Sequence, residues 1–173
     1  EPKQTGTYEF SVPLPFNYEV IDKLAELNDN FQKSQIKTFY NSFPLPLSSN
    51  YNSWIQINRG HNPNVHTYED YKNFIKYAQK KGFKYCHLMN SAKALSERDY
   101  KQVEHDFHFA LDFLHDLGVN DIKFANTQVG DLINDYKYKF DLSSSTVTNY
   151  QNISQYKNLI HNYPNIKLFD IAI

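Results

Sequence analysis

Short apolar segments alternate with segments of helical spacing along most of the chain, and this alternation limits the folds that the chain can adopt. The apolar run from Phe83 to Met89 and the shorter one from Ile122 to Ala125 each lead into a segment whose apolar residues recur at helical spacing. Strands that alternate with helices form parallel β-α units joined by right-handed crossovers. The sequence therefore predicts an α/β fold with a parallel (β/α) barrel-like sheet, a partial TIM-type barrel of about six strands.

The expected strands and helices follow one another in regular order. Thr67–Asp70 and Ser96–Asp99 have the composition of capping boxes, which open helices, and Gly82 and Gly118 are placed to end them. Other helices are expected around residues 20–27, 129–133 and 153–160, and strands at residues 8–15, 36–40, 83–89, 122–125, 140–142 and 166–173. A closed barrel of this type has about eight strands. We therefore expect either that the native polypeptide continues past Ile173 or that another element closes the sheet.

Length, charge and cysteine content narrow the class of protein. At 173 residues the chain has room for a single domain, residues 1–173, with a substantial core. The formal net charge of -1 argues against a protein held to nucleic acid mainly by net charge, and leaves a local basic patch as the alternative. No apolar run is as long as a transmembrane helix and the N-terminus lacks a signal-peptide core, so we expect a soluble, cytoplasmic protein with no membrane partner. The alternative is a protein whose signal was removed before Glu1. The one cysteine, Cys86, lies in an apolar run, which favours a buried structural thiol.

Polar residues cluster where several of the predicted strands end. A parallel barrel builds its ligand site at these carboxyl ends, and Asn, Ser and Thr side chains there offer hydrogen-bond donors and acceptors to a polar ligand. The alternative is that these residues only cap helices and turns. The predicted mouth comprises Asn41, Ser42, Asn90, Ser91, Asn126, Gln128, Ser144, Ser145, Thr146 and Asp170, with Asn90, Ser144 and Thr146 as the strongest candidates.

A long segment without a regular period runs from Phe43 to His66. Loops of this length inside a compact domain are usually functional or disordered, and the apolar Trp54–Ile57 favours an ordered loop. Arg59 in this loop is of the type that clamps a carboxylate or phosphate with two hydrogen bonds, although a surface arginine is the alternative. The predicted substrate-binding set is therefore Arg59, Asn90, Asn126, Ser144 and Thr146, while the catalytic residues stay unknown.

The histidines do not predict a metal site. His105 and His108 lie three apart on an expected helix, a spacing that brings side chains together on one face. Apolar residues fill the inward face of that helix, however, and zinc needs three or four converging ligands. His87 lies in the middle of an expected strand, where a hydrogen-bonded interior residue is favoured over a catalytic base. The sequence has no nucleophile elbow, no phosphate-binding glycine loop and no zinc-protease motif.

Several short motifs follow one another along most of the chain: Ile57–Arg59 with Asn64, Thr67–Asp70, Tyr85–Asn90, Leu117–Ile122, and Leu142–Thr146 with Asn149. Taken in this order, they resemble the motifs of the N-terminal barrel of peptidase family U thirty-two, the collagenase-like proteases. The family's loop in the position of Arg59 also carries an arginine. The last expected strand departs from the family pattern, because Phe169-Asp-Ile-Ala-Ile173 stands where the family continues into an Arg-Glu-Leu segment.

This resemblance implies an enzyme that binds a polar small molecule, a peptide or RNA at the strand mouth. The activity that it implies is peptide processing, or hydroxylation of RNA or of a quinone precursor. Some similar family members bind an iron–sulfur cluster through cysteines, so no cofactor is expected unless the native chain continues to such cysteines. The alternative hypothesis is a non-catalytic binding or assembly module, whose open barrel is completed by a second copy or by a partner chain.

Overall fold

A computed structural model describes residues 8–31, 33–43, 64–91, 93–145 and 152–169 of the chain. It contains one parallel sheet whose six strands are hydrogen-bonded in the order in which they occur in the sequence. The predicted α/β fold with a partial barrel of six strands is therefore confirmed. In chain order the elements are β1 (Tyr8–Pro13), α1 (Tyr18–Asn30), β2 (Ser34–Asn41), α3 (Tyr68–Lys80), β3 (Lys84–Met89), α4 (Glu97–Asp116), β4 (Asp121–Phe124), α5 (Thr127–Asn134), β5 (Asp141–Ser144), α6 (Ile153–Asn162) and β6 (Ile166–Phe169).

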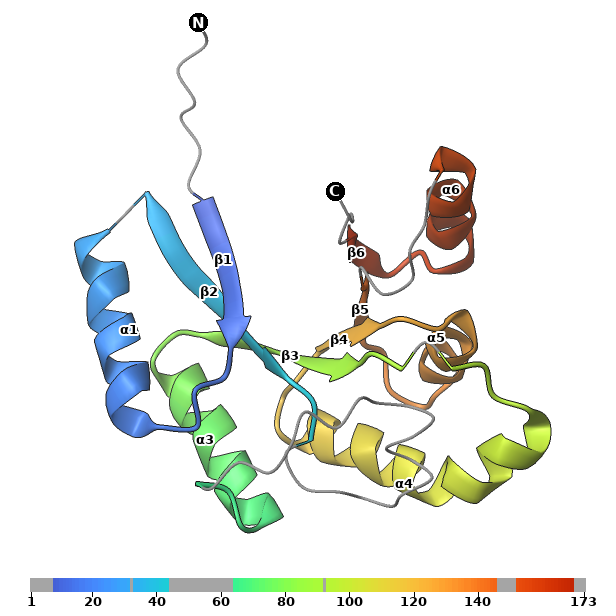
Figure 1. The fold of residues 1–173 in the computed structure, drawn as a ribbon, viewed down its shortest axis with the longest axis horizontal. Coiled ribbons are helices and arrows are strands. Elements are labelled where there is room, and N and C mark those ends of the chain that lie inside the picture. Colours follow the sequence, from blue (N-terminus) through green and yellow to red (C-terminus); the bar gives the residue numbers. More distant parts are fainter. Residues whose placement is uncertain (1–7, 32, 44–63, 92, 146–151, 170–173) are drawn as a thin grey trace, which may run out of the picture.

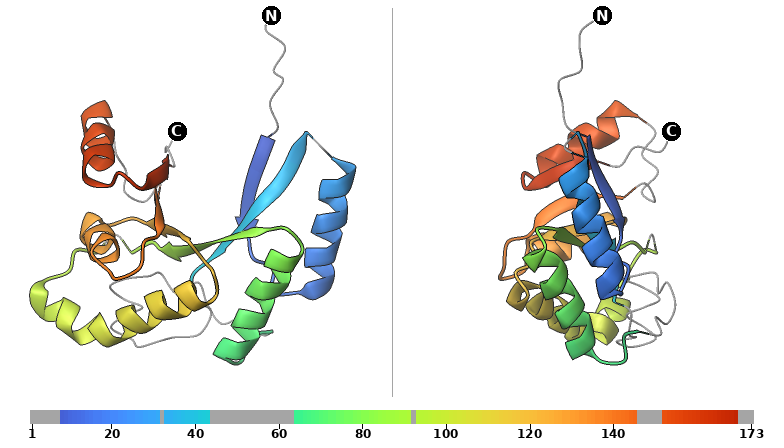
Figure 2. Two further views of the ribbon diagram at one scale, coloured as in Figure 1. Left: turned by 180° about the vertical axis from the view of Figure 1, so that it is seen from behind. Right: turned by 90° about the vertical axis from the view of Figure 1, so that its left-hand side faces the viewer.

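The sheet is open rather than closed. The strands twist strongly, the helices lie around the outside, and β1 and β6 stand apart at the two ends of the sheet (Figure 1). The view from behind shows the same arrangement, with α1 and α6 at opposite sides (Figure 2). Within the described residues β1 and β6 are therefore edge strands, each with one side that no neighbouring strand covers.

Local sequence signals set the ends of the helices. Both predicted capping boxes are present, with Thr67 and Ser96 accepting hydrogen bonds from the third backbone amide of α3 and α4. Asn152 forms a third capping box at the start of α6. Gly82 and Gly118 follow α3 and α4 with φ angles of 90° and 68°, the left-handed region that glycine adopts without strain.

Parallel register places one set of side chains toward the helices. His87, Ile122 and Leu142 form one row across three strands, and Met89, Phe124 and Ser144 form the next row on the same face. Nearly all of these side chains are buried in the core that α3, α4 and α5 also contribute to, through residues such as Tyr71, Phe107 and Ile133. This core fixes the spacing between the sheet and its helices.

The opposite face of the sheet is more polar. Its rows alternate with those of the core, so that Cys86 lies beside Asp121 and Asp141, and Leu88 beside Lys123 and Ser143. The inner face of a closed barrel is normally filled by layers of bulky apolar side chains. Here that face carries charges in place of such layers. No helix within the described residues is long and apolar enough to cross a membrane.

Candidate functional site

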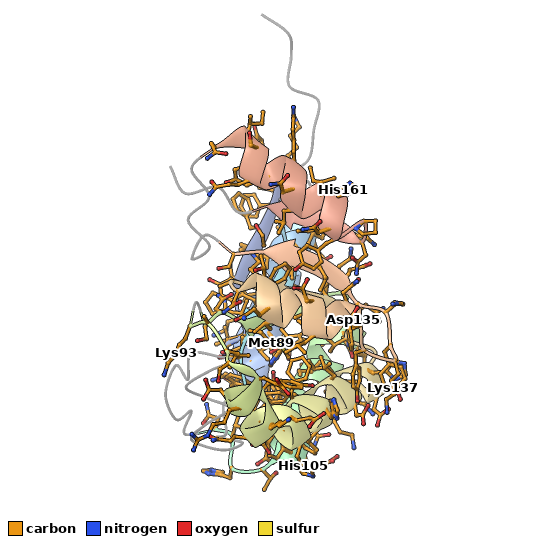
Figure 3. All side chains as sticks on the ribbon, turned by 90° about the vertical axis from the view of Figure 1, so that its right-hand side faces the viewer. Met89, Lys93, His105, Asp135, Lys137 and His161 are labelled. Atoms are coloured by element: carbon orange, nitrogen blue, oxygen red, sulfur yellow. The ribbon has the colours of Figure 1, made fainter. Side chains whose placement is uncertain are left out.

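The carboxyl ends of strands β2, β3 and β5 bring polar residues to one end of the sheet. Ser42 follows β2, Asn90 and Ser91 follow β3, and Ser145 follows β5; all four are buried. Lys93, in the loop after β3, lies at this end of the molecule. Asp135, the residue that follows α5, lies on the opposite side (Figure 3). The described part of the predicted mouth is thus gathered on one side of the fold, as expected for a parallel barrel.

Two buried polar atoms at this end have no hydrogen-bond partner among the described residues. They are Asn90 Oδ1, in a side chain that follows β3 directly, and Ser144 Oγ, at the end of β5. The relative exposure of Asn90 is 7% and that of Ser144 is 0%. Leaving a buried polar group unpaired costs about 1–3 kcal/mol. Because these two unpaired atoms do not stabilise the fold, their burial requires another explanation.

The side chain of Asn126, in contrast, has a hydrogen-bond partner for each of its two polar atoms. Its Oδ1 accepts a hydrogen bond from the backbone amide of Gln128 at 2.8 Å, which caps α5, and its Nδ2 donates to the backbone carbonyl of Lys93 at 2.6 Å. The side chain therefore joins the start of α5 to the loop after β3. Oδ1 and Nδ2 of Asn126 are both hydrogen-bonded within the protein. The predicted contact of this side chain with a substrate stays a prediction.

Gln128 fastens the same loop by a second link. Its Oε1 accepts from the backbone amide of Leu95 at 2.7 Å, and its Nε2 donates to the carbonyl of Leu95 at 3.0 Å. The amide side chain thus binds one backbone residue from both sides, as a neighbouring strand would. Together with Asn126, it holds the loop that begins at Asn90 against the first turn of α5. Gln128 was expected at the mouth, and in the structure it positions a loop there.

The register of β5 separates the three serines at residues 143–145. Ser144 lies in the row of Phe124, which faces the helices, whereas Ser143 lies beside Lys123 on the opposite face. The backbone amide of Ser145 donates to the carbonyl of Phe124 at 2.8 Å and so extends the sheet by one bond. The side chain of Ser144, which was predicted to bind substrate, therefore lies between the sheet and its helices. Arg59 and Thr146, the other predicted site residues, lie outside the described residues, and so do Asp170 and Trp54–Ile57.

A buried aromatic network supports the ends of β2 and β3. The hydroxyl groups of Tyr71 and Tyr85 are hydrogen-bonded to each other, and that of Tyr85 also donates to the backbone carbonyl of Asn41 at 2.9 Å. Burial raises the pKa of both tyrosines, so both stay protonated at neutral pH. This network ties α3 to the last residue of β2, immediately before Ser42.

His87 was expected to be a hydrogen-bonded interior residue, and only the burial is confirmed. The side chain is fully buried, with the ring of Phe43 at a centroid distance of 4.5 Å and that of Tyr85 at 6.4 Å. Neither ring nitrogen has a hydrogen-bond partner among the described residues. Burial lowers the pKa of His87 to about 3, so the imidazole is neutral at physiological pH.

The histidines of α4 lie on the surface of the molecule. His105 is almost completely exposed, His108 contacts the hydroxyl group of Tyr100 at 3.4 Å, and His115 stacks on Tyr138 with ring centroids 3.5 Å apart. No group of three or more potential metal ligands occurs in the part of the chain that the structure describes. The stacking of His115 on Tyr138 attaches α4 to the segment after α5, whereas Tyr100 belongs to α4 itself.

Charges on the polar face of the sheet gather at the other end of the strands. Asp121 and Asp141 are register partners at the first positions of β4 and β5, and Lys167 Nζ lies 2.5 Å from Asp141 Oδ2. Burial, and then the negative charge of Asp141, raise the pKa of Asp121, whereas Lys84 and Lys167 lower it. Filling this face with an apolar partner would strip water from these charges at a cost of several kcal/mol. The polar face therefore requires water or a polar partner.

Comparison with known proteins shows a shared fold but no matching family. No protein-family model matches the chain. No curated protein matches it either. Among solved structures, the U32 peptidase Mk0906 matches over 85% of this chain, with a TM-score of 0.52 and 15% sequence identity. The chain spans about half of that structure, 52% of its length. At this identity the match establishes a shared fold only.

Two further structures match less closely. One is a candidate alpha amylase from Salmonella typhimurium, with a TM-score of 0.44, 12% identity, and coverage of 82% of this chain and 32% of that one. The other is CpGH84B, with a TM-score of 0.43, 13% identity, and coverage of 78% and 26%. The class that the fold defines is therefore an α/β protein with a partial barrel of the TIM type, distantly related in fold to a U32 peptidase.

Proposed function

We propose that this chain forms the substrate-binding part of a (β/α)-barrel enzyme of the U32 peptidase type, and that it holds a polar substrate at the carboxyl ends of its strands. One observation carries the proposal: Asn90 Oδ1 is buried without a partner directly after β3, at the end of the strands where a barrel binds its ligands. Ser144 Oγ, at the end of β5 and between the sheet and its helices, is a second unpaired polar atom beside it in the sequence of strand ends. A substrate that supplied the missing hydrogen bonds would recover the cost of burying them. The shared fold with the U32 peptidase agrees with this reading.

The chemistry of the described groups favours an uncharged, hydrogen-bonding portion of the substrate. Amide and hydroxyl groups both donate and accept hydrogen bonds, as do a peptide backbone and a nucleobase edge. A site of this kind discriminates strongly against analogues that lack the matching group, because its own polar atoms would then stay unpaired. Peptide processing, or hydroxylation of RNA or of a quinone precursor, is the reaction that we propose for the complete site.

An iron–sulfur cluster does not fit this chain. Such clusters are usually held by four cysteine thiolates, and the chain has one cysteine, Cys86, which is buried in β3. We propose that the residues present bind and orient the substrate. In this proposal Asn126 and Gln128 keep the loop after β3 in place, and the buried amide of Asn90 contacts the substrate.

The test is a titration of the isotope-labelled protein, followed by NMR, with three probes. These are a short glycine- and proline-containing peptide, a uridine oligonucleotide, and 4-hydroxybenzoate as a phenolic quinone precursor. We expect one probe to shift the amide signals of residues 41–42, 90–91, 125–126 and 144–145. Asn90→Ala should weaken that binding by about tenfold or more, because it removes a buried hydrogen bond, and should leave the melting temperature nearly unchanged.

A matched control is available on the surface of α3. Asn73 is exposed, so Asn73→Ala should change neither binding nor the melting temperature. The proposal fails if all three probes leave the strand ends unshifted. It also fails if Asn90→Ala lowers the melting temperature as much as it weakens binding, because Asn90 would then be a structural residue.

A further inference from the structure

A groove lies between the last turns of α1 and α3, at the amino ends of the strands. Helices α1 and α3 are neighbours on the same side of the sheet (Figure 1). One wall of the groove belongs to α1, the other to the end of α3 from Lys80 to Gly82, and Gln35 and Lys37 of β2 lie between them. Its volume is about 630 Å³, which is within the range of small-molecule sites. The groove is separate from the carboxyl ends of the strands, where we place the substrate.

An ion pair crosses the groove at one end. Lys81 Nζ lies 2.6 Å from Asp22 Oδ1, and the hydroxyl group of Tyr77 donates to both oxygens of the same carboxylate, at 2.8 Å and 3.0 Å. Asp22 is the first of the α1 residues that line the groove, so these contacts join the two walls at that end. The charges of Asp22 and Lys81 neutralise each other within the protein.

Hydrogen bonds between α1 and β2 fix the floor of the groove. Asn28 Nδ2 donates to the backbone carbonyl of Ile36 at 2.7 Å, and Asn28 Oδ1 accepts from the backbone amide of Ile36 at 2.8 Å. The side chain of Gln35 donates to the backbone carbonyl of Asn28 at 3.4 Å. The wall that α1 forms is therefore held against the strand, and the groove exists before a ligand enters it.

Four more charged side chains line the groove, and their charges are not neutralised within the described structure. Glu26 and Asp29 stand on α1, whereas Lys37 comes from β2 and Lys80 from the end of α3. None of the four forms an ion pair or a side-chain hydrogen bond with another described residue. Carboxylates on one wall and ammonium groups on the floor and the other wall thus share the groove without contacting each other.

Lys37 is the member of this set whose position most requires a partner. It lies two residues before Phe39, which is buried in the core, so both side chains are on the helix-facing side of β2. Lys37 is only partly exposed. An ammonium group that loses part of its hydration is costly unless an anion compensates it. Because the described residues do not supply that anion, a carboxylate from a ligand would stabilise Lys37.

We propose that this groove binds a small zwitterion, a molecule with one ammonium and one carboxylate group, of the class of amino acids and short peptides with free ends. The carboxylate of the ligand lies at Lys37 and Lys80, and its ammonium group lies at Glu26 and Asp29. Hydrogen bonds between charged groups are about twice as strong as those between neutral ones. A ligand with only one of the two charges leaves the opposite pair of side chains without a partner, so the groove discriminates against it.

The test is an NMR titration of the isotope-labelled full chain at neutral pH with three matched probes. Glycylglycine carries both charges, N-acetylglycylglycine carries only the carboxylate, and glycylglycinamide carries only the ammonium group. We expect glycylglycine to shift the amide signals of residues 26–29, 35–37 and 80–82. Each blocked analogue should bind at least about tenfold more weakly, because it loses one of the two charged contacts. The signals of the strand ends report the proposed substrate site separately.

Two substitutions remove one charge from each side of the groove. Lys37→Gln and Glu26→Gln should each weaken the binding of glycylglycine by about tenfold or more. Neither side chain has a partner among the described residues, so both variants should keep the melting temperature of the unsubstituted protein. The matched controls are Lys157→Gln on α6 and Glu104→Gln on α4, because both residues are exposed and do not line the groove. They should leave the binding unchanged.

Three results would overturn the proposal. The first is that glycylglycine shifts none of the signals of the groove, because the four charges would then face only water. The second is that a blocked analogue binds as tightly as glycylglycine, because the groove would then be a site for a simple anion or cation. The third is that the control substitutions weaken binding as much as Lys37→Gln and Glu26→Gln do.

Discussion

His87 is a buried imidazole in an aromatic environment, and its two ring nitrogens have no partner among the described residues. A neutral imidazole has one donor and one acceptor, and burying both unpaired costs free energy. A charged imidazole in this position would cost far more, which is why burial lowers its pKa to about 3. His87 therefore lowers the stability of the folded protein as the pH falls.

The sign follows from the two states of the protein. The unfolded chain takes up a proton on this histidine near its ordinary pKa of 6.5, whereas the folded protein takes it up only near 3. Between these values the unfolded state binds more protons, so acid favours unfolding. Lowering the pH from about 7.5 to about 5 should reduce the free energy of unfolding by about 2 kcal/mol through this residue alone.

His87→Phe should remove this contribution. A phenyl ring keeps the aromatic character of the position beside Phe43 and Tyr85, and it carries no nitrogen to leave unpaired. Urea unfolding at the two pH values measures the change, with His105→Gln as the control, because the side chain of His105 is 98% exposed. If His87→Phe kept the full pH dependence of the unsubstituted protein, His87 would not be the group responsible.

The residue types at the site were predictable from sequence, but their roles were not. Asn90, Asn126 and Ser144 were expected together because each follows an apolar strand, and each does lie at the carboxyl end of its strand. What distinguishes them is the partner of each side chain. Asn126 is bonded to a carbonyl 33 residues away, and Ser144 lies on the helix-facing side. Such long-range contacts and the exact register leave no local trace in a sequence.

At the scale of the elements, α5 lies close to its strand at Gly130. A Cβ at Gly130 would lie 2.7 Å from Cε2 of Phe124 and 3.0 Å from the hydroxyl oxygen of Tyr163. That tyrosine in turn donates to the carbonyl of Thr127 at 2.8 Å and to Asp131 at 2.5 Å. A glycine at this point lets α5 approach the sheet and meet the end of α6.

Gly130→Ala should therefore destabilise the protein. In an exposed helix the change would stabilise by about 1 kcal/mol, but here the overlap with Phe124 should reverse the sign, with a net loss of about 1–3 kcal/mol. Thermal unfolding measures the loss. The double variant Gly130→Ala with Phe124→Leu should recover part of it by removing the ring that the new methyl group meets. Additive losses in the double variant would show that the two positions do not interact.

The elements themselves were largely predictable, because their ends are set locally. The capping boxes at Thr67 and Ser96 and the glycines at residues 82 and 118 act on adjacent backbone groups, and all four occur as expected. Strand β5 runs to Ser144, two residues beyond the apolar stretch that predicted it, since its serines continue the ladder with β4. The segment from 44 to 63 lies outside the described residues, so its predicted order stays untested.

At the scale of the whole molecule, the sheet has one apolar face and one polar face. The apolar face packs against the helices, and its alternation with a polar face follows from the period of two along each strand. The charges of Asp121, Asp141 and Lys167 argue against filling the inside of the sheet with an apolar partner. Exposed large apolar side chains lie on β1, α1, α4 and α6. The unpaired buried polar atoms lie at the carboxyl ends of β3 and β5, in the aromatic layer around His87, and at Asn165, just before β6.

The central claim is that polar atoms at the strand ends serve a ligand rather than the fold. The most direct measurement is the free energy of unfolding of Ser144→Ala, because this change removes only the unpaired, fully buried Oγ. Ser96→Ala is the matched control: its hydroxyl caps α4, and its loss should cost about 1 kcal/mol. We predict that Ser144→Ala leaves the free energy of unfolding unchanged or raises it by up to about 1 kcal/mol. A loss as large as that of Ser96→Ala would contradict the account, because Ser144 would then be holding the fold together.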